Sequence, residues 1–206
     1  MAANAYSFSF LSGALYLKET LALAELLRAH GDWNVVKQLA MEENLLRQRT
    51  AGSRTRLLRE VRHRLKEFSP VEVEFFCNSS PNDQRLMVFV AVCQHFRFIR
   101  EFVDEVVRPK ILALDLQLYP ADYARFFDRK GSESPEFERL TDKSRAKVKQ
   151  VLIRMLAEAG LLDSTASQRI RQPVPSKALV QLLSSQDARR LRFLLLAGAD
   201  IRKPSS

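Results

Sequence analysis

Residues 44–68 read NLLRQRTAGSRTRLLREVRHRLKEF and combine strong positive charge with a helical repeat of apolar residues. The stretch holds eight basic and two acidic side chains, so its net charge is +6 in a chain whose formal total is +9. Its apolar residues follow the three- and four-residue spacing of one helix face: Leu57, Leu58, Val61, Leu65 and Phe68. The pattern predicts a helix over 53–67 with one core face and one guanidinium-rich face.

A second helix is predicted directly before this basic one. Asp32 is a good N-cap for a helix over 33–43, and Gly31 is a suitable end for a preceding helix over 15–29. A short helix, a turn and a basic helix follow one another in helix-turn-helix proteins, which place the last helix in a DNA groove. The candidate DNA contacts here are Arg47, Arg49, Arg54, Arg56, Arg59, Arg62, His63 and Lys66.

The helix 53–67 has an alternative interpretation as a solvated basic face. With the leucines and valine inward, Arg56, Arg59, His63 and Lys66 project outward, and Arg62 lies on one flank. Residues 69–140 carry a net charge of −3. The basic face could therefore pair with this acidic middle of the same chain instead of with DNA.

Residues 135–171 contain a second, weaker copy of the pattern. A long helix is predicted over 142–159 and ends at Gly160, and the segments 161–163 and 169–171 flank a polar turn. This order is typical of a winged helix-turn-helix, although a lysine-rich solvated face is a common alternative. Its candidate DNA contacts are Lys143, Arg145, Lys147, Lys149 and Arg154 in the helix, and Arg169 and Arg171 in the wing.

The fold class predicted from these segments is mainly α. Leu86 to Cys93 is apolar on every side, within a helix predicted over 84–107, so this helix should be buried at the centre. We expect a compact protein with two helix-turn-helix-like lobes, the second winged, and at most one short β-hairpin. The predicted parts are an N-terminal lobe 1–80, a connector 81–118 and a C-terminal lobe 119–206, with two short helices near 176–197 and a frayed tail at 201–206.

The rest of the sequence argues against an enzyme, a metal protein or a membrane protein. The six glycines are isolated, so no phosphate-binding loop is present, and we find no nucleophile motif, metal spacing or cofactor signature. The aromatic residues near 96–127 recur at helical spacing, which favours core packing over base stacking. The longest apolar run has eight residues, whereas a membrane span needs about 20. We expect a soluble, cytoplasmic, DNA-associated monomer without cofactor or metal.

Several long runs of the chain resemble the BrxA family, the small component of BREX (bacteriophage exclusion) defence systems. They extend over residues 13–27, 31–65, 91–107, 122–130 and 138–162. The resemblance covers roughly residues 6–183 and implies a non-enzymatic accessory protein that binds double-stranded DNA beside other BREX components. It brings no catalytic motif with it. Two alternatives stay open: an adaptor that docks acidic surfaces of other defence proteins, and an RNA-binding factor.

Overall fold

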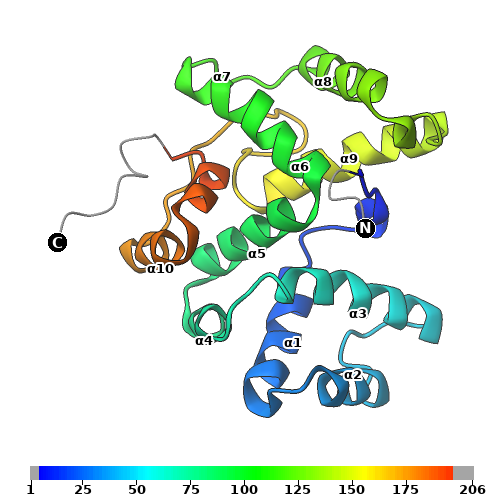
Figure 1. The fold of residues 1–206 in the computed structure, drawn as a ribbon, viewed down its shortest axis with the longest axis vertical. Helices are drawn as coiled ribbons and strands as arrows, with labels where there is room; N and C mark the ends of the chain where they lie inside the picture. Colours follow the sequence, from blue (N-terminus) through cyan, green and yellow to red (C-terminus); the bar gives the residue numbers. More distant parts are fainter. Residues whose placement is uncertain (1–4, 197–206) are drawn as a thin grey trace. The chain divides into compact units, whose positions relative to one another are not determined.

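The computed structural model describes residues 5–196, and its contacts divide the chain into two compact units. We call Leu15–His95 the arginine-rich unit, and Met1–Ala14 together with Phe96–Ser206 the aromatic unit. Both units are built mainly from helices, and a longer non-helical segment connects α9 to α10 in the aromatic unit (Figure 1). The predicted mainly α fold class is therefore confirmed.

The arginine-rich unit is a cluster of helices around α1. Helix α1 packs against α2, α3 and α4, and α3 also packs against α2 and α5. Gly31 ends α1 with a left-handed backbone (φ 67°), a conformation that glycine adopts without steric cost. The helices are α1 (Leu17–His30), α2 (Trp33–Glu42), α3 (Ala51–Leu65), α4 (Pro70–Asn78) and α5 (Pro81–His95).

The basic helix α3 starts at a capping box. The Thr50 hydroxyl accepts a hydrogen bond from the Ser53 backbone N–H, and the Ser53 hydroxyl accepts one from the Thr50 N–H. Leu57, Val61 and Leu65 are buried, as the apolar spacing predicted. The observed helix begins two residues before the predicted start, because the cap is Thr50.

The predicted single helix over 84–107 is wrong. Residues Leu86 to Cys93 lie in α5 and are all buried, as expected, but α5 ends at His95. Phe96 then adopts an extended backbone (φ −103°, ψ 101°) with its ring fully buried against Phe10. Burying this ring takes the chain out of helical geometry, an effect that helical periodicity does not reveal.

The aromatic unit packs its N-terminal segment into a cluster of aromatic rings. Tyr6, Phe8 and Phe10 contact Phe98 of α6, and Phe137 closes the cluster. The prediction of core packing is confirmed by the burial of the six aromatic residues concerned: Phe96, Phe98, Phe102, Tyr123, Phe126 and Phe127. The unit's elements are η1 (Ser9–Ser12), α6 (Arg97–Phe102), the π-helix η2 (Val103–Val107), α7 (Arg108–Leu112), α8 (Pro120–Glu133), η3 (Pro135–Phe137), α9 (Asp142–Glu158), α10 (Lys177–Asp187) and η4 (Ala188–Leu194).

The predicted wing is present only as isolated bridges. Leu162 pairs with Ile170, and Gln117 pairs with Arg169, both in antiparallel orientation. Backbone hydrogen bonds from Ile170 N–H to Leu116 C=O (2.7 Å) and from Arg171 N–H to Leu161 C=O (2.9 Å) extend these contacts. The segment before α8 therefore also pairs with residues 169–170 of the wing, a pairing that the sequence did not predict. The tail 201–206 lies outside the described residues.

The division of the chain differs from the predicted parts 1–80, 81–118 and 119–206. The contacts separate after Ala14 and after His95, because the first residues join the aromatic cluster and α5 joins the arginine-rich unit. Among residues 5–196, no helix has both the length and the apolar character that crossing a membrane requires.

Candidate nucleic-acid interface

The exposed side of α3 carries a row of basic side chains. Arg56, Arg59, Arg62 and Lys66 are exposed, at the three- or four-residue intervals of one helix face. The candidates before and at the start of the helix differ in exposure: Arg47 and Arg49 are exposed, and Arg54 is half-buried. The structure thus brings most of the candidate residues of this segment to one helix and the loop before it.

The guanidinium groups of this row are free of carboxylate partners in the part of the chain that the structure describes. None of Arg47, Arg49, Arg54, Arg56, Arg59 and Arg62 makes an ion pair within residues 5–196. Lys66 Nζ lies 3.9 Å from Glu67 Oε1, which makes it the exception on this face. Unpaired surface guanidinium groups remain available for bidentate contacts to phosphate.

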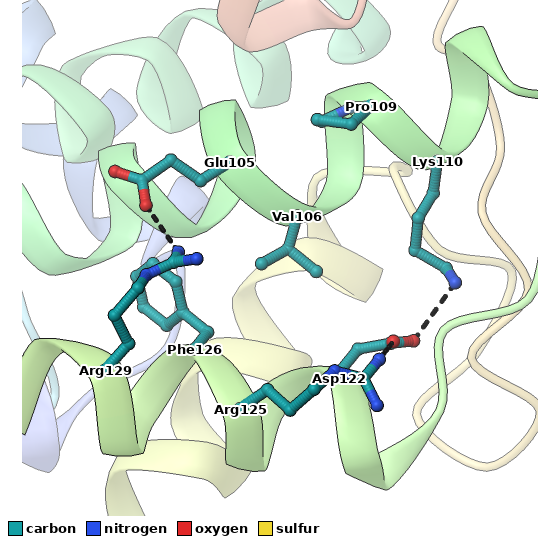
Figure 2. Close-up of a pocket in the computed structure, with 8 residues that line it drawn as sticks. All are labelled: Glu105, Val106, Pro109, Lys110, Asp122, Arg125, Phe126 and Arg129. Carbon is teal, nitrogen blue, oxygen red and sulfur yellow. Dashed lines mark hydrogen bonds and ion pairs between the residues drawn. The ribbon is translucent and has the colours of Figure 1, made fainter.

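Four acidic residues of α6, η2 and α8 are instead paired with basic neighbours of their own unit. Figure 2 shows two of these pairs, which join η2 and α7 to α8. The pairs are Glu101 with Arg97 (2.6 Å), Asp104 with Arg192 (2.6 Å), Glu105 with Arg129 (2.7 Å) and Asp122 with Lys110 (3.1 Å). These four carboxylates already have basic partners, which makes them less available to α3.

Arg62 packs over a tryptophan on the neighbouring helix. Its guanidinium carbon lies 5.1 Å from the centre of the Trp33 ring, at the first residue of α2. A cation over an indole face is held by the negative potential of the ring. Sequence reasoning missed Trp33, and the only signal was that the chain's single tryptophan lies at the start of the helix before the basic segment.

Arg64 belongs to the same basic stretch but lies in the core. Its side chain is fully buried, and its Nη1 lies 3.7 Å from Glu60 Oε2, which is also buried. Its Nε donates a hydrogen bond to the Leu15 carbonyl (3.2 Å), and its guanidinium covers the Tyr16 ring. Arg64 and Glu60 thus attach α3 to the segment that leads into α1, and neither side chain contributes to the surface.

His63 is placed differently from the arginines around it. Its ring stacks on His95, with 4.4 Å between the ring centres, and is half-buried. Burial, together with the nearby His95 and basic side chains of α3, lowers the pKa of His63 to about 4. The candidate contact His63 is therefore uncharged near pH 7 and supplies no positive charge to the interface.

The depressed pKa of His63 predicts that the protein loses stability in mild acid. The unfolded chain binds a proton at its ordinary pKa of 6.5, whereas the folded ring stays neutral down to about pH 4. Unfolding free energy should therefore fall as pH drops between these values, by about 1–2 kcal/mol after allowing for the ring's partial exposure. The measurement is urea unfolding of wild type and His63→Asn from pH 7 to pH 4. If the unfolding free energy fell equally steeply with pH in the variant, His63 would be excluded as the source of the pH dependence.

The candidate contacts on α9 are less available than those on α3. Lys143 and Lys147 are exposed, but Lys147 Nζ donates a hydrogen bond to Gln150 (3.0 Å). The other three are held by neighbours: Arg145 covers the Phe127 ring, Lys149 covers the Tyr123 ring, and Arg154 pairs with Glu158 (2.7 Å). Arg169 and Arg171 are exposed in the bridged segment.

The arrangement offers positive charge and hydrogen-bond donor groups. Within residues 5–196, no group of three or more histidine, cysteine, aspartate or glutamate side chains is arranged to hold a metal ion. The fold and this surface together define a mainly helical protein with a cluster of unpaired arginines on and before one helix.

Comparison with known proteins assigns the family. A sequence model of BrxA matches residues 4–187, so the chain belongs to the BrxA family. The chain is similar to "BREX protein BrxA" of Escherichia coli O9:H4 (strain HS), with 26% identity over 188 residues that cover 89% of this chain and 88% of that protein. It is also similar to "BREX protein BrxA" of Bacillus cereus (strain H3081.97), with 28% identity over 140 residues that cover 68% of this chain and 70% of that protein.

A solved structure shares the fold. The crystal structure of an uncharacterized protein from Magnetospirillum magneticum superposes with a TM-score of 0.79 at 20% sequence identity, covering 93% of this chain and 98% of that one. At this identity the likeness concerns the fold alone.

Proposed function

We propose that this BrxA-family protein is a non-enzymatic accessory protein of BREX phage defence that binds double-stranded DNA through α3 and the loop before it. The observation that carries the proposal is the row of exposed guanidinium groups without carboxylate partners. Arginine side chains that stay unpaired in a chain with many acidic residues favour an external polyanion as their partner. Their number and spacing suit the phosphates of a duplex, whose backbone charges recur at short intervals.

The packing of α3 is also suited to this role. Helices α1, α2 and α3 pack against one another, as in three-helix DNA-binding domains in which the last helix enters the major groove. The eight-residue connection 43–50 is longer than the usual helix-turn-helix turn and carries Arg47 and Arg49. Phosphate contacts from this loop would fix the position of α3 on the duplex without selecting a sequence. Helix α9 and the bridged wing would add weaker contacts.

The change Arg56→Ala with Arg59→Ala and Lys66→Ala tests the proposal. Loss of three phosphate contacts should weaken binding to duplexes of any sequence by about 10-fold to 100-fold at moderate salt. The slope of log K against log salt should fall by about one unit per lost contact. Gel shifts with duplex DNA, single-stranded DNA and structured RNA at two salt concentrations provide the measurement.

A charge-matched control separates a local contact from a general loss of charge. Arg125→Gln with Arg129→Gln and Arg189→Gln also removes three exposed cations, all of them in the aromatic unit. This control should bind duplex DNA nearly as well as wild type. Equal affinities and salt slopes for wild type and the α3 variant would show that α3 is the wrong surface, and a preference for RNA would favour the RNA-binding alternative.

Trp33 is expected to raise DNA affinity by ordering Arg62. Replacing it by leucine should weaken duplex binding by about threefold to tenfold, since a preorganised side chain loses less entropy on binding. The salt slope should be unchanged, because no charge is removed. Trp33→Phe should restore most of the affinity, and Trp33→Leu should have no effect in an Arg62→Ala background. An equal loss in that background would mean that Trp33 acts independently of Arg62.

A further inference from the structure

The connection between α7 and α8 exposes apolar side chains. Leu112, Leu114 and Tyr119 are 56%, 84% and 54% exposed, and all lie within eight residues. Single exposed apolar residues are ordinary on protein surfaces, but a group of them marks a site of contact. This group belongs to the aromatic unit, whereas the basic helix α3 belongs to the arginine-rich unit.

Leu114 is also the wrong residue for its own backbone conformation. Its φ is +59°, in the left-handed region that asparagine and glycine occupy far more readily than leucine. The side chain recovers nothing by packing, because most of it faces solvent. A strained, exposed leucine is explained by neither conformation nor burial, and contact with another molecule would account for it.

A slot between helices lies beside this connection. Its volume is about 190 Å³, and Val106, Pro109 and Phe126 supply its apolar lining (Figure 2). Three ion pairs flank it: Glu105 with Arg129, Lys110 with Asp122, and Arg125 with Asp122. The slot is large enough for one leucine or phenylalanine side chain.

Lys110 joins the slot to the exposed connection. Its Nζ lines the slot, lies 5.4 Å from the centre of the Tyr119 ring and contacts Asp115 at 2.5 Å. Lys110 thus borders both the slot and the exposed connection, and we call the two together the α7–α8 surface: Val106, Pro109, Leu112, Leu114, Tyr119 and Phe126.

The charges at the rim indicate what would bind there. Arg125 and Arg129 have side chains that are 72% and 53% exposed, and each pairs with a less exposed carboxylate of the lining, Asp122 (8%) and Glu105 (35%). The outermost charges are thus two guanidinium groups beside an apolar slot. The lining as a whole contains three basic and two acidic residues, so it lacks the charge excess that draws a polyanion.

We propose that the α7–α8 surface docks a segment of a partner protein that inserts one apolar side chain into the slot and presents carboxylates to Arg125 and Arg129. The protein would then hold DNA with one unit and a protein partner with the other. The docking site stands independently of DNA binding, since it shares no residue with α3.

A short labelled peptide tests this proposal on the full chain. The probe is fluorescein-labelled EELFEEL, followed by fluorescence anisotropy, with KKLFKKL and EEGGEEG as controls for charge and for the apolar side chains. EELFEEL should saturate with a Kd of about 1 mM or lower, a value suited to a small contact. Neither control peptide should saturate in that range.

Two variants locate the contact. Leu114→Asn should keep the fold, because asparagine tolerates the left-handed backbone at this position. It should weaken peptide binding by about fivefold or more. The double variant Arg125→Gln with Arg129→Gln should weaken peptide binding by a similar factor. Val71→Asn, at an exposed apolar residue of the arginine-rich unit, is the matched control and should bind the peptide like wild type.

Several results would overturn the proposal. These are failure of EELFEEL to saturate, equal binding of the control peptides, and a Leu114→Asn variant that binds like wild type. Weaker duplex DNA binding by Leu114→Asn would assign the surface to DNA. Loss of concentration-dependent self-association in that variant, measured by light scattering, would assign it to a second copy of the chain. Unchanged DNA affinity in Leu114→Asn is the result expected if the two sites are separate.

Discussion

The variant Arg64→Met should lose about 3–5 kcal/mol of unfolding free energy, because it leaves the Glu60 carboxylate buried without its cation. Both side chains are buried, with Arg64 Nη1 3.7 Å from Glu60 Oε2. The variant also removes the hydrogen bond to the Leu15 carbonyl and the contact with the Tyr16 ring. Lysine should not substitute well, since it lacks the planar fork that makes these contacts.

The pH dependence of this variant identifies the mechanism. Burial already raises the pKa of Glu60 above its ordinary value of 4.5, although Arg64 opposes the shift. Without Arg64 the pKa should rise further, so the folded state takes up a proton that the unfolded state does not hold. Stability contributed by a raised carboxyl pKa is present at low pH and is lost as pH rises through the folded pKa. Arg64→Met should therefore be less destabilised at pH 5.5 than at pH 8.

A double variant provides the control. Glu60→Leu with Arg64→Met removes both charges and should be much more stable than Arg64→Met alone, since apolar replacement of a buried pair is often nearly neutral. Urea unfolding followed by Trp33 fluorescence reports on the unit concerned. If the single and double variants were equally unstable at every pH, the loss would come from the packing of Arg64 and not from an unpaired charge.

The variant Phe98→Ala should cost a similar 3–5 kcal/mol, because it opens a cavity at the centre of the aromatic unit. Phe98 is fully buried. The centre of its ring lies within 5.8 Å of the ring centres of Phe8, Phe126 and Phe137. Phe98→Leu keeps most of the side-chain volume and should therefore cost less than Phe98→Ala, about 1.5–3 kcal/mol.

The control for this prediction is Phe8→Ala, at a half-buried ring of the same cluster, which should cost clearly less. Thermal unfolding by circular dichroism measures both variants. Trp33, the only tryptophan of the chain, lies in the other unit and reports whether the loss stays local. A Phe98→Ala loss no larger than that of Phe8→Ala would mean that the cluster collapses around the missing ring.

Much of the local structure follows from residue patterns. The spacing of Leu57, Val61 and Leu65 predicted the buried face of α3, and the all-apolar run in α5 predicted complete burial. Such patterns are reliable because helix geometry places residues three and four apart on one face. The break at Phe96 was not predicted, since it depends on where a buried ring finds room among distant residues.

The candidate site likewise combines features that the sequence predicted with contacts that it did not. Periodicity separated Arg56 and Arg59 from the core, but it could not show that His63 stacks on His95 or that Arg62 packs over Trp33. Those contacts join residues from different helices, and their effects on pKa and side-chain order depend on burial in three dimensions.

The sequence by itself determined that this protein is mainly helical, that one segment holds most of its excess charge, and that it resembles the BrxA family. These properties reside in composition and in short-range spacing. Tertiary structure decided which charges remain available, because it buried Arg64 against Glu60 and paired Glu101 with Arg97 and Glu105 with Arg129. Coulomb and desolvation energies depend on distance and burial, and neither can be read from the order of residues along the chain.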